Sequence, residues 1–240
     1  MDGTYLYGGC LFAHFGHFIW ESLPRIAAIR KCPEYPLLFI SPYDRIFETQ
    51  RLFFKTLGIK NEIKLIKNPV RVSRLIYSPA EASLVPLSMT EDTLAALACK
   101  NFAPVMDKKI WLSRSKLKYG LILNERLIEE QIASLGFEIV YPEKTPLLEQ
   151  IKLISSSRIV AGFSGSQFFS AFFARKILGT IIIFNRRLGV PDTIPFLLRS
   201  KNMAGILPMF KVREAEKGAK EGNMIALEPD RIIRTLAENV

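Results

Sequence analysis

Both histidines of the protein stand close together near the start of the chain, and a carboxylate and an arginine follow them. They are His14 and His17, with Glu21 and Arg25 behind. His17 and Glu21 are four residues apart, so on a helix they share one face. A carboxylate fixes a histidine ring and stabilises its protonated form, which suits the ring to act as a general base. We expect His17 to be the base and Glu21 to orient it; exchanged roles or a purely structural cluster are the alternatives.

Pro24 decides how this stretch folds. It either kinks one helix or starts a new helix with Ser22 as its cap, in which case the histidine and the glutamate lie on the preceding turn. His14 and Arg25 are expected beside the pair as supporting residues, with Arg25 keeping Glu21 ionised.

A second stretch, residues 158–176, offers a binding site for an anion. Its apolar run ends at a glycine, and after the next glycine the phenylalanines take helical spacing, which predicts strand, turn and helix. Glycines allow close approach of a ligand, and the first helical N–H groups attract negative charge. We expect a phosphate here; a tight turn without a ligand is the alternative. The expected binding residues are Gly162, Ser164, Gly165 and Ser166.

Arg114 and Lys116 follow another expected strand, in the segment WLSRSK. An arginine at a strand end can form paired hydrogen bonds to phosphate oxygens, and the lysine adds a second positive charge. We expect both to bind the same phosphate; a solvated basic loop is the alternative.

The sequence lacks the motifs that are typical of several other classes of enzyme. A serine hydrolase needs a histidine after the nucleophile, whereas both histidines precede GFSGS, whose second glycine also comes one residue early. There is no P-loop, no dinucleotide fingerprint, no HExxH, no CxxC and no pair of aspartates two apart. We therefore expect neither a metal ion nor a cofactor, and a bound diphosphate must be neutralised by protein groups.

Strand and helix patterns alternate along the chain, which predicts parallel sheets covered on both faces. Expected strands cover residues 36–41, 62–66, 70–79, 109–114, 137–142, 159–161, 179–184 and 204–210. Expected helices cover 45–57, 90–104, 124–136, 146–156, 168–173, 195–200 and the chain from Pro229, while 212–223 is expected to be a solvated loop. We divide the chain into two α/β domains, 1–104 and 105–240, with ligands in the cleft between them.

Composition limits the class of partner. The net charge is +10 and 49% of residues are apolar, which indicates a globular core and an anionic partner. No zinc-finger, RNP or KH signature accompanies the scattered basic residues, so nucleic acid is not expected. Three separated cysteines, Cys10, Cys32 and Cys99, fit a reducing interior. We expect a soluble, cytoplasmic protein.

Taken in order, the segments match those of a known family. His14–Ile26 follow the pattern N-F-G-H-F/W-x-x-E-x-L-P-R-L, with His14 in the asparagine position. The second half agrees at SRSKL from Ser113, the helix start at Asn124-Glu125, GFEIVYPE, Glu149-Gln150 and the G-x-x-G-S turn ending at Ser166. The chain resembles glycosyltransferase family 61 in its bacterial, capsule-associated form. At Ser164 that family has histidine, or glutamate in some bacterial members, and QFFS replaces a histidine that often follows.

The resemblance implies a GT-B architecture, in which two Rossmann-like domains face each other. It also implies inverting, metal-independent transfer of a sugar from a nucleotide-sugar donor to a glycan or lipid-linked acceptor in surface polysaccharide synthesis. The first domain would hold the acceptor and the second the donor, with Glu149 among the donor-binding residues. Peripheral contact with the anionic inner face of the membrane is expected. The alternatives are a nucleotide-sugar epimerase or hydrolase on the same fold and a non-catalytic relative.

Overall fold

The computed structural model describes the chain except residues 80–81, 85–86, 100–101, 187–192, 201–204, 210 and 215–222, and gives the backbone alone at 82–84, 87–88, 106 and 193. The chain divides into two compact units, Met1–Cys99 and Lys100–Val240. From the sequence we placed this division between residues 104 and 105.

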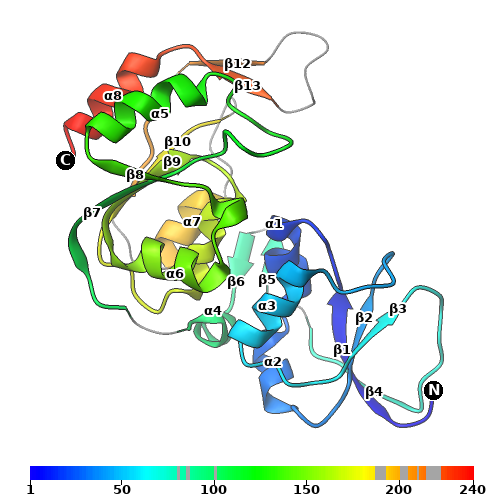
Figure 1. Cartoon of the computed structure of the whole chain (residues 1–240). Helices are drawn as coiled ribbons and strands as arrows, with labels where there is room; N and C mark the ends of the chain where they lie inside the picture. The colour runs from blue at the N-terminus through cyan, green and yellow to red at the C-terminus, as the bar shows by residue number, and fades with distance from the viewer. Residues whose placement is uncertain are drawn as a thin grey trace. The chain divides into compact units, whose positions relative to one another are not determined.

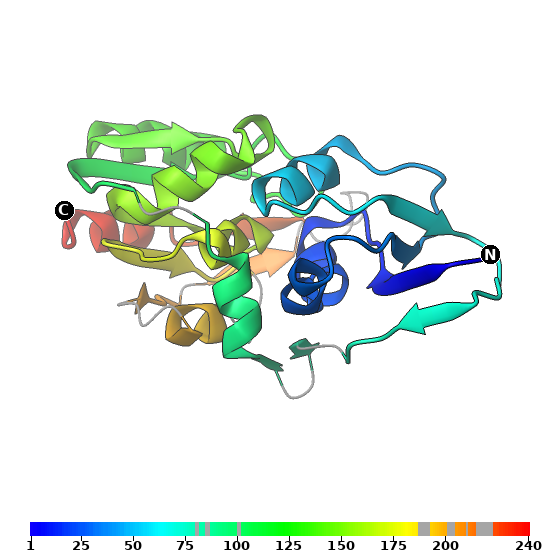
Figure 2. The same cartoon turned by 90° about the horizontal axis from the view of Figure 1, so that it is seen from below.

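The first unit is built on a parallel sheet with the strand order β3-β2-β1-β4, which Figure 2 shows strand by strand. β5 and β6 form a separate antiparallel pair. The strands are β1 (Thr4–Cys10), β2 (Leu37–Ile40), β3 (Ile63–Ile66), β4 (Arg74–Ile76), β5 (Ala82–Leu84) and β6 (Leu87–Met89). The helices are α1 (Phe15–His17), the π-helix η1 (Phe18–Ser22), α2 (Ile26–Lys31), α3 (Glu48–Thr56) and α4 (Glu91–Leu97).

Aromatic side chains join the helices of this unit to its sheet. Phe18 of η1 contacts Phe53 and Phe54 of α3, and Phe54 contacts Phe39 of β2. All four side chains are buried. These contacts join η1 through α3 to the sheet. Because the turn with the two histidines directly follows β1 and leads into η1, it lies at the carboxyl end of the sheet.

The second unit contains a five-stranded parallel sheet with the order β11-β10-β9-β7-β8 and a small antiparallel pair, β12-β13. The strands are β7 (Val105–Leu112), β8 (Phe137–Val140), β9 (Ser157–Phe163), β10 (Thr180–Phe184), β11 (Gly205–Ile206), β12 (Val212–Glu214) and β13 (Met224–Ala226). The helices are α5 (Glu125–Ser134), the 3₁₀ helices η2 (Pro142–Lys144) and η3 (Ser166–Phe173), α6 (Leu147–Ser156), α7 (Thr193–Ser200) and α8 (Pro229–Ala237).

Helices cover both faces of this sheet. Ile159, Ala161 and Phe163 of β9 belong to one buried cluster with Ile128 of α5 and Ile232 of α8. Residues in a strand alternate between faces, so the intervening residues of β9 turn toward the other layer, where α6 and α7 pack against η3. Figure 1 shows α5 and α8 side by side on one side of the sheet and α6 and α7 on the other. The predicted α/β class with parallel sheets is thus confirmed.

The structure differs from the sequence-based expectations in a few elements. The helix expected over 90–104 ends at Leu97, because Ala98 takes an extended conformation. The segment after Gly165 forms a 3₁₀ helix rather than an α-helix. Residues 212–214, expected in a loop, form β12, and most of the remainder of that expected loop lies outside the described residues. Of the strand expected over 204–210, the structure shows only Gly205–Ile206 as β11, and residues 204 and 210 also lie outside the described part.

Candidate active site

Three strands of the second unit end side by side at the carboxyl edge of the sheet. β9 pairs in parallel with β7 on one side and with β10 on the other, so that Gly162 is level with Leu112 and Ile183. The segments that leave these strands therefore begin next to one another. They carry Arg114 after β7, the serine-glycine turn after β9, and Arg186 after β10. In open parallel sheets, ligands bind at this edge.

Arg114 lies against the glycine turn, as we expected from the sequence. Its guanidinium group donates from Nη1 to Oε1 of Gln167 (2.7 Å) and from Nε to the carbonyl of Gly120 (3.0 Å), and only 8% of the residue is exposed. A Cβ atom on Gly165 would lie 2.2 Å from Nη1 of Arg114. The guanidinium group thus lies close against the backbone of Gly165, and a side chain at this position would displace it.

Arg186 reaches the same place, although we did not include it among the site residues. Its Nε donates to the carbonyl of Ser164 (3.2 Å), and its backbone N–H donates to Oγ of Ser164 (3.1 Å). A Cβ on Gly120 would lie 2.9 Å from Nη1 of Arg186 and 3.1 Å from Nη2 of Arg114. The signal in the sequence was an arginine directly beyond a buried apolar strand, the same signal that identified Arg114.

A buried carboxyl group supports the loop after β7. Glu125, the first residue of α5, is fully buried; its Oε1 accepts from Nε1 of Trp111 (3.0 Å) and from the backbone N–H of Arg114 (3.1 Å). Burial raises the pKa of the Glu125 carboxyl to about 8, against the lowering effect of these two hydrogen bonds. The carboxyl group thus holds a proton at neutral pH and still fixes the backbone of Arg114.

The other expected donor-binding residues have different surroundings. Gly162 lies inside β9, where a Cβ would be 2.8 Å from the carbonyl of Leu112 and 3.3 Å from Phe168, so the chain itself fills its space. Lys116 is exposed and lies 3.4 Å from the centroid of the Tyr141 ring. Glu149, in the first turn of α6, forms an ion pair with Lys152 (3.8 Å). Ser166 begins η3 and is half-buried.

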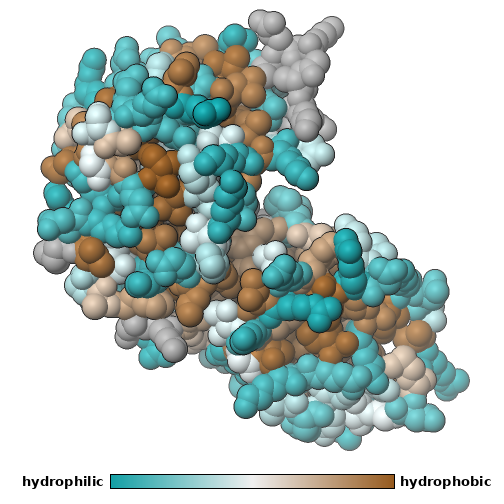
Figure 3. Space-filling view, viewed as in Figure 1, coloured by the Kyte–Doolittle hydropathy of each residue, from teal (hydrophilic) through white to brown (hydrophobic). Residues whose placement is uncertain are grey.

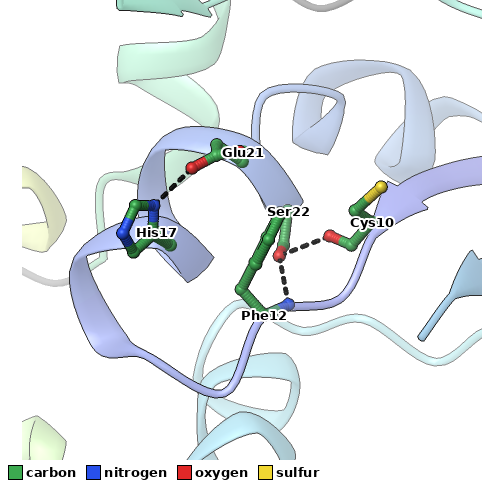
Figure 4. Close-up of polar contacts among 5 residues, drawn as sticks. All are labelled: Cys10, Phe12, His17, Glu21 and Ser22. Atoms are coloured by element: carbon green, nitrogen blue, oxygen red, sulfur yellow. Dashed lines mark hydrogen bonds and ion pairs between the residues drawn. The ribbon is translucent and has the colours of Figure 1, made fainter. Parts of the chain in front are cut away.

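In the first unit, a serine fixes the turn that follows β1. Oγ of Ser22 donates to the carbonyl of Cys10 (2.6 Å) and accepts from the N–H of Phe12 (3.1 Å), as Figure 4 shows. Ser22 therefore does not cap the next helix, α2, which begins at Ile26 after Pro24. The proline separates two helical segments, and His17 and Glu21 lie on the first of them.

His17 and Glu21 face each other across one helical turn (Figure 4). Nδ1 of His17 is hydrogen-bonded to Oε1 of Glu21, and the two side chains are 55% and 34% exposed. When Glu21 is ionised its oxygens only accept, so that a neutral His17 in this contact carries its hydrogen on Nδ1 and its lone pair on Nε2. The turn is a π-helix, in which the N–H of Leu23 bonds to the carbonyl of Phe18. The pairing predicted from the four-residue spacing is present, and Nε2 has the character of a base.

The two supporting residues are placed differently. The ring of His14 meets that of His17 edge to face, with centroids 5.1 Å apart. Arg25 is buried, lies over the ring of Tyr7 and donates from Nε to the carbonyl of Ser78 (2.9 Å). Both Arg25 and Glu21 are described, and no ion pair joins them, so Arg25 does not have the partner we expected.

A family model described as Glycosyltransferase 61 matches residues 15–183, well over half of the sequence. No curated protein matches the chain. Among solved structures, the crystal structure of a flavodoxin-like domain from Synechococcus sp. is similar over 55% of this chain and 92% of its own, with a TM-score of 0.34 and 15% identity. In the described residues, no helix is long and apolar enough to cross a membrane, and no group of three or more His, Cys, Asp or Glu side chains could hold a metal ion.

Proposed function

Because the chain belongs to glycosyltransferase family 61, we propose that it is an inverting glycosyltransferase that uses a nucleotide-sugar donor and needs no metal ion. The family supports glycosyl transfer as the reaction. We assign the acceptor to the class of glycans or lipid-linked sugars used in surface polysaccharide synthesis in the cytoplasm, as in the bacterial, capsule-associated members that the motifs resemble. A GT-B arrangement of the two units belongs to this proposal.

The donor diphosphate is assigned to the carboxyl edge of the sheet in the second unit. The observation that carries this assignment is the contact between Arg114 and the glycine turn, because it puts a guanidinium group where three parallel strands end. Guanidinium groups bind phosphate oxygens through paired hydrogen bonds and keep their charge at any working pH. As the bond to the leaving diphosphate breaks, this charge stabilises the negative charge that develops on it.

The base is assigned to His17 in the first unit. Its Nε2 takes the proton from the acceptor hydroxyl while that oxygen attacks the anomeric carbon of the donor, and Glu21 stabilises the imidazolium that results. The attack on the face opposite the leaving group inverts the anomeric configuration. The hydrogen bond from Nδ1 to Glu21 supports this assignment, since it fixes the tautomer that has a free lone pair on Nε2.

Two measurements test the proposed function. A thermal-shift screen against nucleotide-sugars should reveal the donor, because a ligand at a hundred times its dissociation constant stabilises the folded protein by about 2.7 kcal/mol. Incubation of that donor with acceptor candidates should then give a glycosylated product of inverted configuration, in the presence of a chelator as well as without it. Turnover of the donor with no acceptor present would instead indicate an epimerase or hydrolase.

Calorimetry on Arg114→Ala tests the donor site. We expect binding of the nucleoside diphosphate to weaken by roughly 1.5–3 kcal/mol, the range for a hydrogen bond to a charged group. Because the substitution also removes the partner of Gln167, thermal denaturation must first show that the variant is folded. Unchanged affinity in a folded variant would show that Arg114 does not bind the diphosphate.

A further inference from the structure

Arg186 is held in a defined position by the serine that departs from the family pattern. Ser164 is 2% exposed, and its own N–H donates to the carbonyl of Phe184 (2.7 Å). Its hydroxyl and carbonyl oxygens accept the backbone N–H and the Nε of Arg186. The serine thus links the end of β9 to the residue that leaves β10, and it directs the arginine along the edge of the sheet.

Gly120 gives the two arginines room to approach each other. It has a φ of +64°, a left-handed conformation that side chains rarely adopt, and its carbonyl accepts from Arg114. Because Nη1 of Arg186 and Nη2 of Arg114 both lie close to the position of its missing Cβ, these two atoms are no more than about 6 Å apart. At this separation, one anion can accept hydrogen bonds from both guanidinium groups.

We propose that Arg186 is the second cationic residue of this anion site, that Ser164 positions it, and that the pair of arginines selects a diphosphate over a monophosphate. The inference rests on the proposed function for the identity of the ligand. Arg114 is almost fully buried and held by Gln167, whereas Arg186 is half-buried. A diphosphate gives each guanidinium group a phosphate of its own, whereas a single phosphate must be shared between the two groups.

Calorimetry with matched pairs of ligands tests the selection. The probes are the common ribonucleoside diphosphates and the corresponding monophosphates, with inorganic pyrophosphate and orthophosphate as probes without a base. We expect Arg186→Gln to weaken diphosphate and pyrophosphate binding by about tenfold or more and monophosphate binding by less than about threefold. Arg186→Lys should fall between, because lysine keeps the charge and loses the planar fork.

A control variant separates this local effect from the loss of one charge. Arg158→Gln removes an exposed arginine at the opposite end of β9 and should leave both affinities within about twofold of the wild type. Ser164→Ala removes the hydroxyl that accepts from the backbone N–H of Arg186 but keeps the carbonyl that accepts from its Nε, so it should weaken diphosphate binding less than Arg186→Gln does.

The outcomes distinguish this inference from the proposed function. If Arg186→Gln weakens both ligand classes equally, or neither, in a folded variant that still transfers sugar, the inference is wrong and the function stands. If pyrophosphate binding depends on Arg186 but no sugar transfer is found, the anion site stands without the function. A wild-type protein that binds no diphosphate at all would contradict both.

Discussion

At the scale of single residues, the proposed anion site in the second unit depends on a buried carboxyl group beneath it. Glu125 is fully buried under the loop of Arg114, and its oxygens accept hydrogen bonds from Trp111 and from the backbone of that arginine. Because this buried carboxyl group stays protonated, it holds the loop in place through its hydrogen bonds. It puts no negative charge beneath the guanidinium groups of Arg114 and Arg186. A carboxyl group with a raised pKa makes the position of Arg114 and the stability of the unit sensitive to pH.

Glu125→Gln should alter how stability varies with pH. The pKa of Glu125 is raised from 4.5 to about 8, so between these values the unfolded chain has lost a proton that the folded chain keeps. The free energy of unfolding therefore falls as pH rises through this window, by up to a few kcal/mol, and levels off above about pH 8. Urea denaturation at pH 5, 6.5 and 8 should show that the free energy of unfolding of the wild type falls, relative to that of Glu125→Gln, as the pH rises.

The matched control is Glu130→Gln on the exposed side of the same helix, which should follow the wild type at every pH. Parallel pH profiles for Glu125→Gln and the wild type would show that Glu125 does not hold the extra proton.

His17→Ala tests the proposed base. We expect turnover to fall by roughly 10²–10⁴-fold while donor affinity is retained, the usual consequence of losing a general base. Glu21→Gln should do less, because the amide oxygen can still accept from Nδ1 and hold the ring. The measurements are turnover at saturating donor and calorimetry with the donor diphosphate. If His17→Ala keeps turnover and Glu21→Gln abolishes it, the two roles must be exchanged; if neither changes turnover, the turn is structural.

At the scale of elements, the sequence was most informative where a helix or strand depends on its own residues. The end of α3 follows from Gly58, and the N-cap of α4 is Thr90, whose side chain accepts from the backbone of Thr93. The 3₁₀ character of η3 could not be predicted, because the spacing of its phenylalanines indicates a helix but does not distinguish the 3₁₀ from the α form. The same limit applies to the site: spacing alone paired His17 with Glu21, but the approach of Arg186 to Arg114 depends on pairing between strands far apart in sequence.

Gly162, near the end of β9, and Gly165, in the turn after it, should respond differently to substitution by alanine. Gly162→Ala puts a Cβ against the backbone carbonyl of Leu112, so we expect it to destabilise the second unit by roughly 1–3 kcal/mol and to leave diphosphate affinity nearly unchanged. Gly165→Ala puts a Cβ into the guanidinium group of Arg114, so we expect mainly a loss of diphosphate affinity. Denaturation and calorimetry on both variants check the contrast; equal effects on affinity would show that both glycines border the ligand.

At the scale of the whole molecule, the net charge of +10 exceeds what two arginines in one site require. Hydrophilic side chains are interspersed with hydrophobic ones over each unit on the face in Figure 3. We attribute the excess charge to an anionic membrane surface or a lipid-phosphate acceptor, because basic residues near such a surface each contribute about 1 kcal/mol to binding.

Vesicle flotation tests the membrane assignment. At low salt, we expect the protein to float with vesicles that contain anionic lipid and to remain behind with neutral vesicles, and added salt should release it because the attraction is screened. Equal recovery with both kinds of vesicle at low salt would contradict the membrane assignment.

The parallel pairing of β7, β9 and β10 also determines the stage of folding at which the proposed anion site forms. Parallel neighbours are joined by long crossover connections, and contacts between such distant segments form only after the entropy of closing the loops has been overcome. Arg114, Gly165 and Arg186 leave three different strands of one sheet. A newly synthesised chain that has formed its local helices but not yet its sheet therefore lacks the proposed diphosphate site.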